Sequence, residues 1–223
     1  MPRKPAASRS SPPSSSSSPW PPSARPARPH EVRIIGGQWK RTRLAVPDKP
    51  GLRPTPDRVR ETLFNWLASL AGAGGGELPG WHCLDAFAGT GALGMEAASR
   101  GAASVLLCEQ DAALVAQMQA AKTRLSAEAV RVERGNGLAA LERAPAGSLD
   151  AIFLDPPFDN AALYQPALRA ATRALRAGGA IYLEAPARWS DEEISALGLV
   201  VFRYLKAGAV HAHLLLHATD GTA

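Results

Sequence analysis

The chain has 223 residues, of which 46% are hydrophobic and 20% are charged, and it carries a formal net charge of +5. This length and apolar content suit one α/β domain with appendages and a substantial core. No segment approaches the roughly 18 consecutive apolar residues of a membrane span, which argues against a membrane protein. Cys83 and Cys108 lie in apolar, strand-like segments. We therefore expect buried thiols in a reducing, cytoplasmic compartment rather than a disulfide framework or a metal site.

The charge is distributed unevenly along the chain. Residues 1–54 hold 11 Lys/Arg and 2 Asp/Glu, whereas residues 55–223 hold 14 and 18. A basic arm ahead of a slightly acidic domain predicts a polyanionic partner whose phosphates supply affinity. The alternative is a solvated, positively charged tail.

Residues 1–30 are rich in Ser, Pro and Arg and nearly lack apolar side chains. Such a composition cannot bury enough surface to form a packed core, so we expect a disordered extension. Residues 31–76 are predicted to form a basic amino-terminal extension made of a β-hairpin and a helix. Its strands are expected at 32–35 and 38–46, with a turn at Gly36-Gly37 and a loop at 47–54.

The helix of this extension is expected to begin at Thr55-Pro56-Asp57, with Thr55 as N-cap and Pro56 at the first helical position. The glycine-rich run 72–76 is expected to end it.

Residues 77–223 alternate between short apolar runs and helical patterns. Strands are predicted at 83–87, 104–108, 130–133, 149–154 and 180–184, and helices at 92–100, 111–125 and 161–176. This alternation predicts a mostly parallel sheet with helices on both faces. The final strands, 198–206 and 210–217, are joined by a tight turn, so the last one is expected to be antiparallel.

The tetrapeptide Asp155-Pro156-Pro157-Phe158 follows the buried strand predicted at 149–154. The carboxyl ends of strands in open α/β sheets are where ligands bind. Asp155 can accept an N–H, Phe158 can stack on a flat ring, and the prolines stiffen the loop. The set suits a nucleobase amine, and the alternative is a plain proline turn.

A glycine-rich loop runs from Asp85 to Gly94, between a strand and a helix. Gly89, Gly91 and Gly94 satisfy G-x-G-x-x-G, so a nicotinamide dinucleotide is one possible ligand. Asp85 would face a pyrophosphate unfavourably, but it suits a cationic amino group or sulfonium. This favours S-adenosylmethionine.

Two polar residues follow neighbouring predicted strands. Glu109 can bind a ribose diol in either interpretation. Asn136 can donate to and accept from an adenine edge, or it can belong to a simple Asn-Gly turn.

These motifs resemble a known family. Asp85 to Gly94, Glu109, Asn136 and Asp155 to Phe158 are similar to the ordered motifs of class I methyltransferases acting on exocyclic amines. The blocks 32–41 and 51–67 closely resemble the bacterial RsmD family of 16S rRNA guanine-N2 methyltransferases. The resemblance covers roughly residues 31–217.

The resemblance implies a class I, Rossmann-like methyltransferase that uses S-adenosylmethionine and methylates the N2 amine of one guanine. We expect a monomer, and no metal, since the sulfonium is already a good leaving group. The implied partner is 16S rRNA in the small ribosomal subunit or an assembly intermediate. The implied catalytic residues are Asp155, Pro156, Pro157 and Phe158. The implied cofactor residues are Asp85, Phe87, Ala88, Gly89, Thr90, Gly91, Glu109, Gln110, Asn136 and Gly137. The implied RNA contacts are Arg33, Lys40, Arg41, Arg43, Arg53, Thr55 and Arg58.

Other functions fit parts of the pattern. Each basic residue has an alternative role as a solvated charge or salt-bridge partner, and Arg53 and Thr55 can instead border the cofactor. A methyltransferase acting on DNA adenine N6 or protein glutamine, a nicotinamide-dependent oxidoreductase and a non-catalytic ribosome-assembly protein are the competing classes. Asp155, Phe158 and the amino-terminal block argue against both other methyltransferase targets, adenine N6 and protein glutamine.

Overall fold

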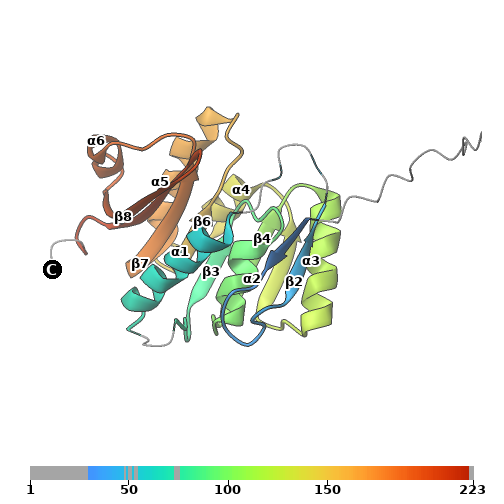
Figure 1. Cartoon of the computed structure of the whole chain (residues 1–223). Coiled ribbons are helices and arrows are strands. Elements are labelled where there is room, and N and C mark those ends of the chain that lie inside the picture. Colours follow the sequence, from blue (N-terminus) through green and yellow to red (C-terminus); the bar gives the residue numbers. More distant parts are fainter. Residues whose placement is uncertain (1–29, 48, 50–51, 53–54, 73–75, 221–223) are drawn as a thin grey trace, which may run out of the picture.

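A seven-stranded sheet lies at the centre of the computed structural model, which describes residues 30–47, 49, 52, 55–72 and 76–220 (Figure 1). Its strand order is β5-β4-β3-β6-β7-β9-β8, with β3 to β7 parallel and β9 antiparallel to both of its neighbours. The predicted mostly parallel sheet with an antiparallel last strand is confirmed. The strands are β3 (His82–Asp85), β4 (Ser104–Glu109), β5 (Val130–Arg134), β6 (Leu149–Leu154), β7 (Leu175–Ala185), β8 (Leu199–Ala207) and β9 (Val210–His217).

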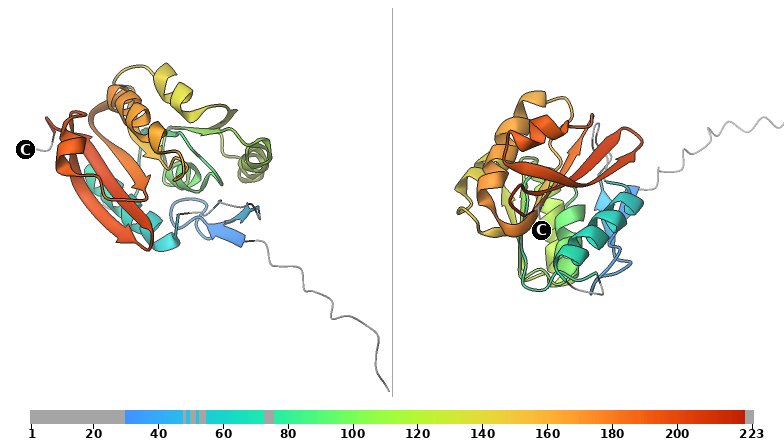
Figure 2. Two further views of the ribbon diagram at one scale, coloured as in Figure 1. Left: turned by 90° about the horizontal axis from the view of Figure 1, so that it is seen from above. Right: turned by 90° about the vertical axis from the view of Figure 1, so that its left-hand side faces the viewer.

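Helices cover both faces of the sheet (Figures 1 and 2). Successive strand residues point to opposite faces, so Phe153 packs in one core and Ile152 in the other. The first face carries α1 (Asp57–Leu70), α2 (Ala92–Ser99) and α3 (Ala112–Leu125). The second carries α4 (Gly137–Arg143), the short 3₁₀ helix η1 (Ala161–Leu163), α5 (Tyr164–Ala174) and α6 (Asp191–Ser195). Within the described residues, no helix is long and apolar enough to cross a membrane.

The region before α1 is a two-stranded antiparallel hairpin of β1 (His30–Arg33) and β2 (Arg43–Val46). The prediction of a continuous strand at 38–46 is wrong for residues 38–42. Tight turns occupy that stretch, with Lys40 N donating to Gly37 O over 3.2 Å and Thr42 N to Trp39 O over 3.0 Å. The predicted tail at 1–30 lies outside the described residues, apart from His30 in β1.

The transition from α5 to β7 also differs from the prediction. The helix expected at 161–176 ends at Ala174, and β7 begins at Leu175 rather than 180. Leu175 already pairs with Leu149 of β6, and a register shift follows within the ladder. The glycines at 178 and 179 are therefore accommodated inside the strand, where Gly178 has φ 73°.

The helix α1 begins at Asp57, and the prediction that Thr55 caps it is wrong. Pro56 occupies the N-cap position without a side-chain cap bond. The Thr55 hydroxyl instead donates to Glu184 Oε1 over 2.6 Å. The apolar side of α1 packs on the sheet, where the rings of Phe64 and Phe153 have centroids 5.9 Å apart. The helix of the basic extension thus forms part of the layer that covers the first face.

A buried carboxylate on α2 fastens the hairpin to this layer. Glu96 has no exposed surface and accepts hydrogen bonds from Ile35 N and Gly36 N, each over 2.7 Å. It also accepts from Arg100 Nε over 2.8 Å and lies 3.5 Å from Arg60 Nη1. Two guanidinium groups and two backbone amides thus offset the cost of burying one charge.

We predict that Glu96→Ala lowers the free energy of unfolding by about 3–5 kcal/mol, because it leaves Arg60 and Arg100 buried without their shared counter-charge. Urea denaturation of both proteins measures this. Glu31→Ala is the control, since it removes an exposed ion pair with Arg43 and should cost at most about 1 kcal/mol. Equal losses in the two variants would contradict the prediction.

Candidate active site

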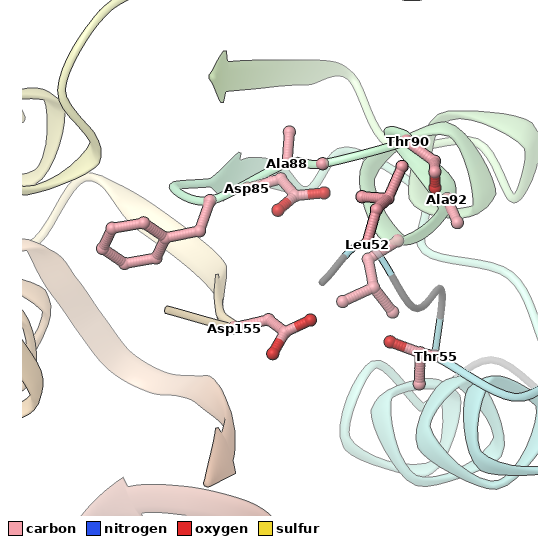
Figure 3. Close-up of a pocket in the computed structure, with 10 residues that line it drawn as sticks. Leu52, Thr55, Asp85, Ala88, Thr90, Ala92 and Asp155 are labelled. Atoms are coloured by element: carbon pink, nitrogen blue, oxygen red, sulfur yellow. The ribbon is translucent and has the colours of Figure 1, made fainter. Parts of the chain in front are cut away.

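A pocket opens at the carboxyl ends of β3 and β6, between the glycine loop and the start of α1 (Figure 3). In Figure 3, Asp85, Asp155 and Thr55 come from three separate elements and face the same space. Six of the residues predicted for catalysis or cofactor binding line the pocket: Asp85, Phe87, Ala88, Gly89, Thr90 and Asp155. Four further residues complete the lining: Leu52, Thr55, Ala92 and Leu93.

The loop between β3 and α2 positions Asp85 beneath the glycines. Gly91 has φ 76° and forms the N-cap of α2, a backbone conformation that other residues adopt at a cost. A Cβ at Gly94 would lie 2.0 Å from Leu107 Cδ2, so only glycine allows α2 to pack this close to the sheet. This close packing brings Gly94 N within 3.0 Å of Asp85 Oδ2, to which it donates a hydrogen bond.

Glu109 at the end of β4 ties the next strand to the same loop. Its Oε2 accepts from Gly89 N and its Oε1 from Asp111 N, each over 2.9 Å. Gln110, also predicted to bind the cofactor, follows with an exposed side chain.

Asn136 and Gly137 begin α4, a helix that the sequence patterns do not predict. Asn136 is the N-cap, and its Oδ1 accepts from Ala139 N over 3.1 Å. The cap uses only the side-chain oxygen of Asn136, so the amide hydrogens of this side chain remain available to a ligand. A Cβ at Gly137 would lie 2.0 Å from Ala86 O, so glycine is required where α4 meets the end of β3.

The tetrapeptide after β6 combines buried and exposed groups. Pro156 is buried, whereas Phe158 is 40% exposed and is the one exposed large hydrophobic side chain among the described residues. Pro157 is exposed as well. Tyr164 OH lies 3.4 Å from Pro156 O and donates to it, which braces the loop against α5. An uncovered ring thus stands next to a rigid carboxylate corner.

Three acids give the site a negative character, of which Asp85 and Glu184 are buried and Asp155 is partly exposed. Burial raises the pKa of Asp85 to about 7, the Gly94 N–H opposes this shift, and Glu109 and Glu184 add to it. Burial, followed by the charges of Glu184 and Asp85, raises the pKa of Asp155 well above its usual value. Burial also raises the pKa of Glu184. The pocket therefore suits a cation far better than the pyrophosphate of a dinucleotide.

One predicted residue has a different location, and one acid was missed. Thr55, expected to contact RNA, is only 5% exposed and lines the pocket, because its hydroxyl is bonded to Glu184. Glu184 was not among the predicted site residues. Its signal was present, since it ends the apolar run of β7 as Asp85 ends β3 and Asp155 follows β6.

The basic residues predicted to contact RNA lie on the hairpin and α1. Lys40, Arg41 and Arg58 are exposed and form no salt bridge within the described part of the chain. Arg33 pairs with Asp57 over 3.1 Å and Arg43 pairs with Glu31 over 2.7 Å. Arg53 lies outside the described residues.

Comparisons with known proteins agree with this geometry. The family model described as conserved hypothetical protein 95 matches residues 32–215. Ribosomal RNA small subunit methyltransferase D of Escherichia coli strain K12 is 40% identical over 183 residues, covering 78% of this chain and 88% of that protein. The Haemophilus influenzae protein of the same name is 37% identical over 189 residues, covering 78% and 92%.

Solved structures show the same fold. A putative methyltransferase, yhhF, from Escherichia coli has a TM-score of 0.69 and 36% identity, covering 84% of this chain and 98% of that one. The strand order, the glycine loop after β3 and these likenesses define a class I methyltransferase fold, the class whose methyl donor is S-adenosylmethionine. Within that class, the chain belongs to the RsmD family.

Asp85 makes the stability of the ligand-free protein depend on pH. Because its pKa is about 7 in the folded state and ordinarily 3.8, the folded protein binds more protons between these values. Its contribution to stability is therefore lost as the pH rises through 7. We predict that Asp85→Asn is more stable than the wild type at pH 8 by roughly 2–4 kcal/mol, and equally stable near pH 4.

Urea denaturation at both pH values, without cofactor, measures the difference. Asp159→Asn, a change at an exposed carboxylate, should show the wild-type pH dependence. If the free energy of unfolding of Asp85→Asn changes with pH in parallel with that of the wild type, Asp85 does not have the raised pKa.

Proposed function

We propose that the chain transfers a methyl group from S-adenosylmethionine to the exocyclic N2 amine of a guanine in 16S rRNA of the small ribosomal subunit. The observation that carries the proposal is the corner of Asp155 and the exposed Phe158 beside an acidic pocket. The names of the relatives support small-subunit rRNA as the substrate. The choice of guanine N2 rests on the chemistry of this corner and on family resemblance.

The residues predicted to bind the cofactor, some of which line the pocket, fit it by their chemistry. Asp85 is a buried carboxylate at the pocket wall, suited to the ammonium of the methionine end. Glu109 is suited to the ribose hydroxyls, and the Asn136 amide hydrogens are suited to the adenine edge. The flat loop of Ala88 and Gly89 allows close approach of the backbone. S-adenosylmethionine supplies an electrophilic methyl on a sulfonium, which is a good leaving group and needs no covalent intermediate.

The acceptor amine needs orientation more than a strong base. The lone pair of an exocyclic amine is delocalised into its ring, so the nitrogen is nearly planar. Asp155 and the Pro156 carbonyl would accept its protons, bias it toward a pyramidal form and direct the lone pair at the methyl. Phe158 would stack on the base. In-line positioning supplies much of the rate, and the guanine must be unpaired or flipped to enter.

We predict that Asp155→Ala lowers methyl transfer by about 100-fold or more while the cofactor still binds. The reason is that Asp155 serves the acceptor amine, whereas Asp85 and Glu109 serve the cofactor. Transfer of a labelled methyl group and isothermal titration with S-adenosylmethionine measure the two effects separately. A parallel collapse of cofactor affinity would show that this division of roles is wrong.

RNA contact is assigned to the exposed basic face of the hairpin and α1. Lys40, Arg41 and Arg58 are solvent-accessible cations on the segment that leads into the pocket wall at Thr55. The exposed pairs of Arg33 and Arg43 are weak enough to be exchanged for phosphates.

We expect the triple variant of Lys40→Ala, Arg41→Ala and Arg58→Ala to bind RNA more weakly, with a salt dependence reduced by up to about 3 units of slope. Its affinity for S-adenosylmethionine should stay unchanged. Arg169→Ala, on α5 across the sheet, is the charge control. If the salt dependence of RNA affinity is unchanged in the triple variant, RNA binds to another surface of the protein.

The experiment that tests the function is methylation of 30S particles and free 16S rRNA with labelled cofactor, followed by mapping of the modified nucleotide. The expected product is a single N2-methylguanine. Label on adenine or on protein, or no label at all, would overturn the proposal.

A further inference from the structure

Glu184 is a buried acid next to Asp155 that the proposed function does not use. The parallel register aligns Leu154 of β6 with Leu183 of β7, so the two acids follow at the same edge of the sheet. Glu184 is 2% exposed. Asp155 beside it is partly exposed. Two neighbouring carboxyl groups do not both ionise freely, so one of them carries the negative charge in preference to the other.

Hydrogen bonding distinguishes the two acids. Glu184 Oε1 accepts from Thr55 Oγ1 over 2.6 Å and from Tyr182 OH over 2.8 Å. Asp155 accepts no hydrogen bond from the described residues. Donors that point at a carboxylate favour its ionised form. Glu184 is therefore the member of the pair whose negative charge the protein stabilises.

We propose that Glu184 is a positioning residue that keeps the negative charge of this pair, so that Asp155 is the member that takes the proton released by the methylated amine. This rests on the proposed function. As the guanine nitrogen forms its bond to the methyl carbon, the carbon–sulfur bond breaks and its electron pair stays on sulfur. The nitrogen then gives one proton to the Asp155 carboxylate, which passes it to water.

The groups around Asp155 and Glu184 support the assignment of the charge to Glu184 and of the proton to Asp155. The titratable neighbours of Asp155 are Glu184 on β7, Asp85 on β3 and Tyr164 on α5, and Tyr182 stands beside Glu184. Burial and the two neighbouring carboxylates raise the pKa of Asp155 well above its usual value. For Glu184, the hydroxyls of Thr55 and Tyr182 oppose the effect of burial. Burial also raises the pKa of both tyrosines, which therefore stay neutral.

The buried cation on α1, Arg60, is committed elsewhere. The titratable residues of β9 nearest to Glu184 are His211 and His213, which pair with Ala185 and Leu183 and so face the other side of the sheet. Arg60 bonds to Thr55 O, Arg33 O and Asp57 and pairs with Glu96. The β9 residue that pairs with Glu184 is Ala212. The carboxyl pair therefore has no fixed counter-charge among the described residues, and a cationic ligand completes it.

The decisive variant is Glu184→Gln, because the amide oxygen of glutamine can still accept both hydroxyl hydrogens while the charge is lost. Removing a negative neighbour lowers the pKa of Asp155. The acidic limb of kcat/KM should therefore move to lower pH by about one unit or more. The plateau should fall on the order of 10-fold, because Asp155 becomes a weaker proton acceptor.

A second readout does not depend on turnover. A cationic cofactor favours ionised Asp155, so its binding to the wild type near pH 7 should release protons. Isothermal titration in two buffers of different ionisation enthalpy measures that release, and Glu184→Gln should release fewer. Tyr182→Phe removes one donor from Glu184 and should shift the acidic limb in the same direction by less. Glu128→Gln, at the exposed turn before β5, is the charge-matched control and should match the wild type.

An unshifted acidic limb with wild-type proton release in both Glu184→Gln and Tyr182→Phe would overturn the assignment and leave Glu184 a structural residue. If the variants give that result while the wild type binds cofactor and methylates RNA, the proposed function still stands. If the wild type neither binds S-adenosylmethionine nor methylates RNA, the proposed function falls and the role of Glu184 falls with it.

Discussion

The gathering of three carboxyl groups at one edge of the sheet, two of them buried, is the constraint on which the rest of the site depends. Asp85, Asp155 and Glu184 stand at the carboxyl ends of β3, β6 and β7, which are neighbours in the sheet. Removing such groups from water is costly unless donors or cations compensate. The protein supplies one backbone amide to Asp85 and two hydroxyls to Glu184. A cationic ligand would best offset the desolvation cost that these donors leave uncompensated. This explains how a stable fold can contain an acidic pocket.

The same constraint joins the basic extension to the catalytic domain. Thr55 stands just before α1 and donates to Glu184, while Glu96 of α2 holds the hairpin through Ile35 and Gly36. The segment that presents Lys40 to solvent is thus bonded at both ends to elements of the sheet layer. The basic extension therefore carries exposed cations and also supplies Leu52 and Thr55 to the pocket. Distortion of the extension or of the pocket is expected to reach the other through Thr55.

Local patterns were enough to predict much of this. The alternation of strands and helices, the glycine loop and the tetrapeptide after β6 are short-range signals, and each specifies its own neighbourhood. The prediction that Thr55 is an N-cap is wrong because its hydroxyl donates to Glu184, 129 positions further along the chain. Glu96 looks like an ordinary helical glutamate, and its contacts with Ile35 and Gly36 span about 60 positions. Partners this distant leave no local pattern, so only the folded chain reveals them.

Sequence position alone also cannot rank the three acids, since each stands at or just beyond the end of an apolar run. The folded structure ranks them by their partners. Asp85 receives one N–H from the loop, Glu184 receives two hydroxyls, and Asp155 receives none from the described residues. A carboxylate without donors binds a proton more readily than one that has them. During methyl transfer the positive charge would pass from sulfur to the amine nitrogen beside Asp155, so the amine N–H would become acidic next to the carboxylate that lacks other donors.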